Sequence, residues 1–202
     1  MVRTKKDVVA EFRRAEILDA AYRVFAERGF EQATMAEIAG VAGVAKGTLY
    51  LYYPSKQDIY DAALRQSAVD VDALTKSALG GARTAGEKIQ AFIGTKLRYF
   101  EEHRDFFRLS EREFGCRARG HGPHAKHLDE LRLAQVKLLD QILQQAVRRK
   151  AIRPIRTEAA ASAIFDLTRS IVMQRLRGAS KATLDEDIGF AFDLTWKGIG
   201  YR

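Results

Sequence analysis

Apolar residues recur three or four positions apart along most of the 202-residue chain, which is the spacing of one face of an α-helix. Segments with this pattern cover residues 12–28, 34–42, 45–53, 55–79, 84–103, 104–116, 124–150, 157–177 and 183–199. No segment alternates apolar and polar residues between turn residues, as a half-buried strand would. The sequence therefore predicts an all-α fold of about nine helices.

Hydroxyl and acidic residues spaced three apart mark where several of these helices begin. The hydroxyl of the first residue can accept the backbone N–H of the last, whose carboxylate binds back to the first. This pattern occurs at Thr34 and Glu37, Ser55 and Asp58, Thr84 and Glu87, and Thr183 and Glu186. Gly29 and Gly43 tolerate the left-handed backbone that closes a helix, so we expect two helices to end beside them.

Residues 34–53 hold two short helices joined by one tight turn. In the second of them, Leu49 and Tyr53 share a side that should be buried, whereas Gly47 and Tyr50 lie on another side. This arrangement is typical of a helix-turn-helix, whose second helix can enter the major groove of DNA.

Residues 12–64 carry the motifs ILDAA, FAERGF, GVAKGTLY and SK in that order. In order and spacing these motifs resemble the N-terminal domain of the tetracycline-repressor (TetR) family of bacterial transcription regulators. The resemblance covers about a quarter of the chain. It implies a ligand-responsive repressor that binds a palindromic double-stranded DNA operator as a homodimer and is released from DNA by a small-molecule inducer.

The pattern and the resemblance together divide the chain into two domains. Residues 1–54 should form a three-helix DNA-binding domain, and residues 55–202 a larger helical domain for ligand binding and dimerisation. Two other functions stay open, because an activator or a ligand-independent regulator would share every DNA-binding feature. An enzyme would need a convergent set of titratable side chains, and none is evident, so we expect neither an enzyme nor a cofactor.

Three residues of the reading helix should face the base edges. Thr48 and Tyr50 can approach the bases, and Gly47 lets the backbone come close, because this surface lacks bulky apolar groups. The alternative for Tyr50 and Tyr52 is that both rings pack on the first helix of the domain.

Four further residues should bind DNA phosphates. Lys46 and Lys56 bracket the reading helix, so their charges lie where phosphates would pass. In relatives the positions of Tyr52 and Lys56 hold phosphates. Thr34 can donate to a phosphate from the beginning of its helix, where the helix dipole also favours an anion.

Three positions depart from the family pattern. Ala45 stands where a serine often caps the reading helix, a loss of about 1 kcal/mol. Gly40 lies inside the preceding helix at a similar cost. Position 36, where some relatives carry an arginine that reads guanine, is Ala36. Discrimination between operators should therefore depend on residues 46–50 and on DNA shape.

The net charge of +8 adds little to the DNA argument. Residues 1–60 hold nine Lys and Arg against eight Asp and Glu, so the DNA-binding part is nearly neutral. Only local placement supports DNA binding. Near the N-terminus, Arg3, Lys5 and Lys6 form either an arm that touches DNA or a solvated tail.

Aromatic residues in the second domain predict a pocket for a small apolar or aromatic effector. The candidates are Tyr99, Phe100, Phe106, Phe107, Phe114 and Phe165. Each alone is ordinary core, but together they exceed what a thin helical layer needs, and family members hold an inducer between these helices.

The last two helices are apolar on two sides, so each needs two partners. One side can cover the domain's own core, and the other can pack against a second copy of the chain. The residues expected at this interface are Ile164, Leu167, Ile171, Ile188, Phe192 and Thr195. The alternative is that a thick monomer buries both sides; family members dimerise through these helices.

Composition gives no sign of a membrane or a metal. The chain is 47% hydrophobic and 30% charged, and it lacks a signal peptide or an apolar run long enough to span a bilayer, so we expect a cytoplasmic protein. The single cysteine, Cys116, suits a reducing compartment. His121, His124 and His127 have a spacing that could gather a metal, but without an acidic ligand we expect a solvated loop.

Overall fold

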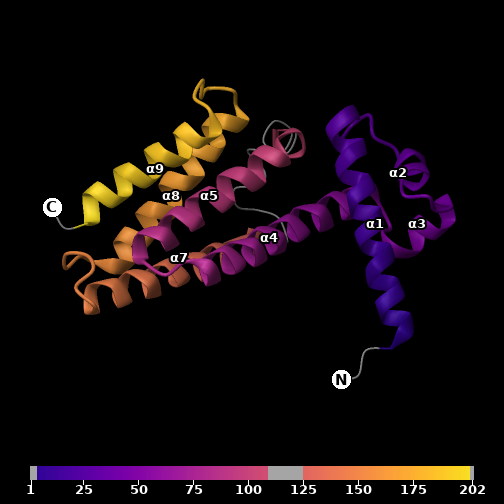
Figure 1. Ribbon diagram of the computed structural model, residues 1–202. Helices are drawn as coiled ribbons and strands as arrows, with labels where there is room; N and C mark the ends of the chain where they lie inside the picture. Colours follow the sequence, from indigo (N-terminus) through magenta and orange to yellow (C-terminus); the bar gives the residue numbers. More distant parts are fainter. Residues whose placement is uncertain (1–3, 109–124, 201–202) are drawn as a thin grey trace. The chain divides into compact units, whose positions relative to one another are not determined.

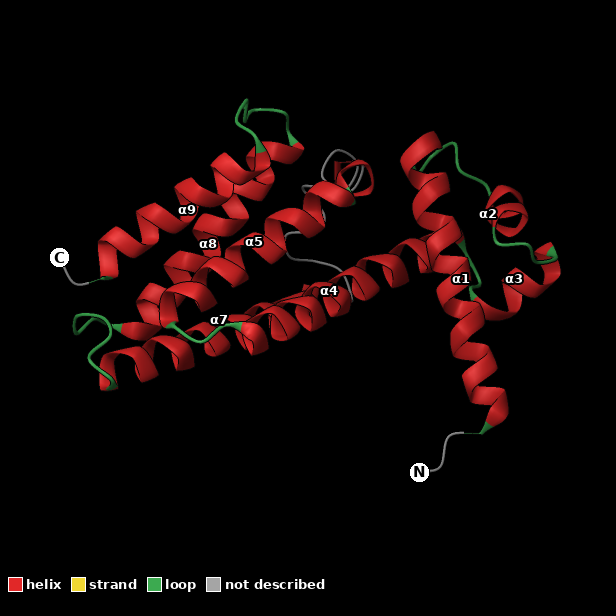
Figure 2. Cartoon of the chain, in the orientation of Figure 1, coloured by secondary structure: helices red, strands yellow, loops and turns green. Residues whose placement is uncertain are grey.

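The computed structural model describes residues 4–108 and 125–200, and within these ranges all regular structure is helical (Figure 2). The predicted all-α class is confirmed. The helices are α1 (Lys5–Arg28), α2 (Met35–Val41), α3 (Lys46–Tyr52), α4 (Lys56–Gly81), α5 (Ala85–Glu102), α7 (Ala125–Arg148), α8 (Thr157–Leu176) and α9 (Leu184–Ile199) (Figure 1). Residues 104–108 are also helical.

The predicted hydroxyl–acid pairs begin their helices as expected. Thr34, Thr84 and Thr183 each form a reciprocal capping box. A fourth capping box, formed by Thr4 and Asp7, was missed. Because the Thr4 hydroxyl accepts the Asp7 N–H at 3.2 Å and the Asp7 carboxylate accepts the Thr4 N–H at 2.9 Å, α1 begins seven residues before the predicted position.

Two compact units divide the chain. Of the described residues, the first unit contains 4–67 and 105–108, and the second contains 68–104 and 125–200. Helix α4 contributes its first part to one unit and its remainder to the other. The predicted functional boundary after residue 54 stays a prediction.

In the first unit, α2 packs against both α1 and α3. Ile17, Ile38 and Leu49, one from each helix, are fully buried. Gly43 closes the turn between α2 and α3 with a φ of 65°, in the left-handed region that the sequence predicted. The core thus fixes how α3 is presented.

In the second unit, α5 contacts α7, α8 and α9. Its inward residues Ile89, Phe92 and Ile93 are fully buried, and Leu139 of α7 meets the same core. No helix within residues 4–108 and 125–200 combines the length and the apolar character needed to cross a bilayer.

Candidate DNA-binding surface and ligand site

Helix α3 packs against the core of the first unit through one fully buried residue, Leu49. It begins after Ala45, whose extended backbone carries no side-chain cap, and it ends at Tyr53. Tyr53 is also buried, and this burial raises the pKa of its hydroxyl. The buried side of α3 therefore matches the prediction, and the opposite side lies open.

The residues expected at the base edges lie on this open side. Gly47 is exposed, and a Cβ built on it would meet no atom within 4 Å. Thr48 is half-buried, and Tyr50 is 44% exposed. A DNA backbone or base edge can therefore come close to α3 at Gly47 without meeting another part of the described chain.

Leu51 was missed as a candidate contact. Its side chain is 85% exposed, and it lies four residues after Gly47 and three after Thr48, on the same side of α3. The expectation that this surface lacks bulky apolar groups was therefore wrong. The helical period alone would have placed Leu51 beside Gly47. An exposed leucine at a reading surface suits contact with the methyl group of thymine.

Tyr52 has a neighbour on the first helix, as the alternative interpretation proposed. The Arg14 guanidinium of α1 lies 5.8 Å from the centre of the half-buried Tyr52 ring. The phosphate contact expected of Tyr52 stays a prediction. Tyr50 keeps its exposed position.

Lys56 is joined to the loop that precedes α2. Its ammonium donates to the backbone carbonyls of Phe30 and Glu31, the latter at 3.0 Å, and lies 4.5 Å from the centre of the Phe30 ring. Two of its three N–H donors are thus used inside the chain. A phosphate contact would rest on the third donor, which makes Lys56 as much a structural residue as a DNA anchor.

The hydroxyl of Thr34 is already used in the capping box of α2. Its hydroxyl donates to the Glu37 carboxylate at 2.9 Å, and the same oxygen accepts the Glu37 N–H at 3.2 Å. The Thr34 hydroxyl and the Thr34 backbone N–H, which also donates to this carboxylate at 2.9 Å, lower the pKa of Glu37, so a negative charge persists beside Thr34. A phosphate at this point would meet that charge, which weakens the case for Thr34. Lys46 is exposed at the first position of α3.

The aromatic residues expected in one pocket belong to different units. Phe106 and Phe107 belong to the first unit, where the Phe106 ring packs against Tyr22 at 4.6 Å between centres. Tyr99, Phe100 and Phe165 belong to the second unit. Phe114 lies outside the described residues.

In the second unit, Phe165 lies 6.5 Å from Phe92, measured between ring centres. Tyr99 is packed against Phe100 at 5.9 Å and against His103 at 4.6 Å. In these three ring contacts Phe92, Phe165 and Tyr99 are buried, whereas Phe100 and His103 are half-buried. The predicted effector pocket of these aromatic residues stays a prediction.

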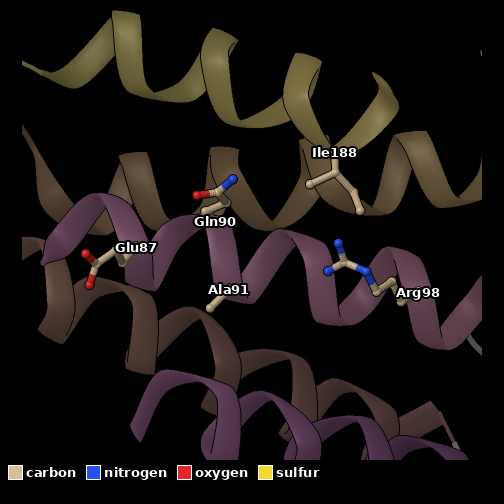
Figure 3. Close-up of a pocket in the computed structure, with 5 residues that line it drawn as sticks. All are labelled: Glu87, Gln90, Ala91, Arg98 and Ile188. Carbon is tan, nitrogen blue, oxygen red and sulfur yellow. The ribbon is translucent and has the colours of Figure 1, made fainter. Parts of the chain in front are cut away.

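An open pocket of about 270 Å³ lies between α5 and α9 (Figure 3). Its lining residues are Glu87, Gln90, Ala91, Arg98 and Ile188. Three of these five residues carry charged or amide side chains, and none of the six predicted aromatic residues is among them. We therefore do not assign the apolar effector to this pocket.

The predicted dimer residues mostly face their own core. Ile164, Ile171, Ile188 and Thr195 are buried within the single chain, whereas Leu167 and Phe192 are half-buried.

The exposed apolar residues of α9 are instead Phe190, at 59%, and Leu194, at 54%. The helical period predicted two apolar sides of α9, but the second copy of the chain was expected on the side that faces the core. The candidate surface for a second copy therefore moves to Phe190 and Leu194.

His121, His124 and Cys116, expected in a solvated loop or beside it, lie outside the described residues. His127 lies within α7. Within residues 4–108 and 125–200, no three His, Cys, Asp or Glu side chains are grouped as a metal site would require.

Comparison with known proteins places the reading helix in a family motif. Residues 17–63 match the family model described as bacterial regulatory proteins, tetR family. The fatty acid metabolism regulator protein of Bacillus subtilis (strain 168) is 52% identical over 44 residues, which cover 22% of this chain and 23% of that protein. The chain thus aligns with less than a quarter of that relative's length.

Two longer matches extend beyond the DNA-binding part. The HTH-type transcriptional repressor KstR2 of Mycobacterium tuberculosis (strain CDC 1551 / Oshkosh) is 25% identical over 142 residues, or 70% of each chain. The crystal structure of FadR from Bacillus subtilis in complex with stearoyl-CoA superposes with a TM-score of 0.74 at 23% identity, covering 91% of this chain and 98% of that one. This second likeness concerns the fold.

Proposed function

The chain belongs to the tetR family of bacterial regulatory proteins, and from this premise we propose that it is a ligand-responsive transcriptional repressor that binds its operator as a homodimer. The observation that carries the proposal is the open side of α3. A short helix anchored by buried Leu49 presents Gly47, Tyr50 and Leu51 to the outside. Such a surface fits a DNA major groove.

Base recognition would come from this side of α3. Tyr50 offers a hydroxyl for a base edge, Leu51 offers an apolar contact for a thymine methyl, and Gly47 permits a close approach of the backbone. Lys46 and Tyr52 would hold phosphates, with smaller parts for Lys56 and Thr34 because both already have partners inside the chain.

Dimerisation would pair the recognition helices of two copies. Phe190 and Leu194 lie four residues apart on α9, so they form one exposed apolar strip. Leu167 of α8 is half-buried and could extend the surface. A two-fold dimer would place its α3 helices in two major-groove segments of a palindromic operator.

Release would depend on an effector in the second unit. We propose a small apolar or aromatic molecule; the apolar acyl chain of the stearoyl-CoA bound to the structurally similar FadR of Bacillus subtilis supports the apolar character of this class. The effector must bind the DNA-incompetent conformation more tightly than the DNA-bound one, since equal affinity would shift nothing. Helix α4 is a continuous element through which such a shift could pass, because it contributes to both units.

Selection of bound fragments from the genome of the source organism tests DNA recognition. We expect recovery of a palindromic site by the wild-type chain. Gly47→Ala should then weaken affinity for that site about tenfold, because a methyl group is added where the DNA approaches. Gly40→Ala is the matched control, since a Cβ at Gly40 also meets no atom within 4 Å.

Equal loss of affinity in both glycine variants would contradict a reading surface centred on Gly47. A reporter gene fused to the recovered site separates the alternatives. Repression that is relieved by a metabolite extract supports the proposal, whereas increased transcription on binding indicates an activator. Repression that no extract or added compound relieves indicates a ligand-independent regulator.

A further inference from the structure

Lys96 is a cationic residue in the interior of the second unit. It lies on α5, and its side chain is only 6% exposed. Lysine is almost never buried to this extent without an anionic partner, because removing the ammonium from water is costly. The contacts of Lys96 therefore need an explanation.

Neutral groups surround the Lys96 ammonium. It donates one hydrogen bond to the Oε1 atom of Gln135 on α7, which is itself 4% exposed. The Nζ atom lies 5.1 Å from the centre of the Phe92 ring and 4.8 Å from the centre of the Phe165 ring on α8. Aromatic faces attract a cation but supply no formal negative charge. Two of the three N–H donors find no hydrogen-bond acceptor among the described residues.

The acidic group that acts on Lys96 also forms an ion pair with another lysine. Asp72 on α4 acts electrostatically on Lys96, but its Oδ2 atom lies 2.6 Å from the Nζ atom of Lys76. Burial lowers the pKa of Lys96 to about 8, and Asp72 offsets only part of that effect. The interior thus holds a positive charge whose compensation is incomplete.

A purely structural role would not require this charge. A neutral side chain could join α5 to α7 at lower cost, because an incompletely paired buried charge is a poor source of stability. A group that brings its own negative charge would instead gain from the site: the free donors, the low polarity of the surroundings and the two rings all favour it.

We propose that Lys96 anchors the carboxylate of an apolar effector, with Gln135 as a second donor and the Phe92 and Phe165 rings beside the apolar part of the molecule. The inference rests on the proposed function, because it names the chemical class of that regulator's effector. A carboxylate at this point would enter where α5 meets α7. The packing of these two helices would then differ between the free and bound proteins, as an effector that shifts a conformational equilibrium requires.

Matched probes that differ only in the acidic head group test the proposal. The full chain is titrated by calorimetry at pH 7 with octanoate and octanol, and with naphthoate and naphthylmethanol. The wild-type chain should bind the carboxylate of at least one pair about tenfold more tightly than its alcohol, as expected for a charge-assisted hydrogen bond.

Lys96→Met should remove the preference for the carboxylate and leave affinity for the alcohol within about twofold, since methionine fills a similar apolar volume. Lys88→Met on the same helix is the control, because Lys88 is half-buried and should keep the preference. Circular dichroism and thermal unfolding establish that each variant is folded.

Gln135→Glu provides an independent second test. The new carboxylate would neutralise Lys96 from inside the chain and so compete with the probe, which should lose about tenfold in affinity. Wild-type protein that prefers neither carboxylate, or a folded Lys96→Met variant that keeps the wild-type preference, would overturn the proposal. Operator affinity without any probe is measured separately, so failure of DNA recognition is distinguishable from failure of carboxylate recognition.

Discussion

The reading helix and the interior of the second unit use charge in opposite ways. Helix α3 presents Lys46, Tyr50 and Leu51 on an open surface. The second unit buries Lys96 and half-buries Arg175, and the partners of both come from other helices. An exposed recognition surface costs the fold little, whereas each buried charge must be compensated by a specific neighbour. Mutations should therefore separate recognition from stability in the first unit and couple them in the second.

The largest expected effect concerns Arg175, whose side chain is 14% exposed. It donates to Glu101 of α5 at 3.0 Å and to Asp187 of α9 at 2.7 Å, and it lowers the pKa of Glu101. Arg175→Met should leave two acidic groups poorly compensated and destabilise the protein by about 3 kcal/mol. Chemical denaturation at pH 7 measures this loss.

Lys197→Met is the matched surface control for Arg175→Met. Lys197 contacts Asp193 at 2.7 Å, but both side chains are more than half exposed. Its removal should change the free energy of unfolding by less than about 0.5 kcal/mol. Similar losses in both variants would mean that the Arg175 contacts stabilise no more than a surface ion pair.

The next effect has the opposite sign. Lys96→Met should stabilise the protein at pH 7 by on the order of 2 kcal/mol, because it removes an incompletely paired buried charge. The facing groups are Asp72 on α4, Gln135 on α7 and Phe165 on α8, of which only Asp72 is charged. Thermal unfolding of both proteins across a pH series measures the difference.

The pH dependence follows from the direction of the Lys96 shift. Burial lowers its pKa from 10.5 to about 8, so between these values the unfolded chain binds the extra proton. The stability of the wild-type protein, relative to Lys96→Met, should therefore rise with pH across this window. The penalty is complete below pH 8 and relieved towards pH 10.5. A difference that stays constant from pH 7 to pH 10 would contradict burial of the charged form.

Helix ends and the reading helix could be predicted because their causes are local. The Thr34 hydroxyl and the Glu37 N–H lie three residues apart, and Gly43 sets its own backbone angle. Hydrogen bonds of this range are visible in any short window of sequence. The buried side of α3 also follows from the helical period alone, as Leu49 demonstrates.

The interior chemistry could not be predicted in this way. Lys96 falls within the apolar stripe of α5, but its partner Gln135 is 39 residues away. Periodicity tells which residues share a side of a helix, and it does not tell what covers that side. For the same reason Ile188 was expected at a dimer interface, although it is buried in its own chain.

The next largest expected effect is a loss of operator affinity. Tyr50→Ala and Leu51→Ala should each weaken binding about tenfold, the loss expected for one base contact, while the free energy of unfolding stays nearly constant because both side chains are exposed. Leu133→Ala on α7, another exposed leucine, is the control and should bind as wild type. Titration of labelled operator at fixed salt measures all three.

Leu51→Ala should in addition relax sequence preference at one operator position, because only a thymine presents the methyl group in the major groove. A uniform loss on every tested operator would instead place Leu51 against the DNA backbone. Unchanged binding in both Tyr50→Ala and Leu51→Ala would remove α3 as the reading element.

The smallest expected effect is a gain in stability at Ala45. This residue has the extended backbone of an N-cap but lacks a side-chain oxygen, so the first N–H groups of α3 receive no side-chain cap. Ala45→Ser should stabilise the protein by about 1 kcal/mol and raise Tm by about 2–4 °C.

Gly47→Ala should also raise the helix propensity of α3, yet it should weaken DNA binding, whereas Ala45→Ser should leave DNA binding unchanged. Loss of operator affinity in a folded Ala45→Ser variant would show that the first turn of α3 must change its conformation when DNA binds. It would then contradict the contrast between a rigid reading surface and an interior whose buried charges are costly to stability.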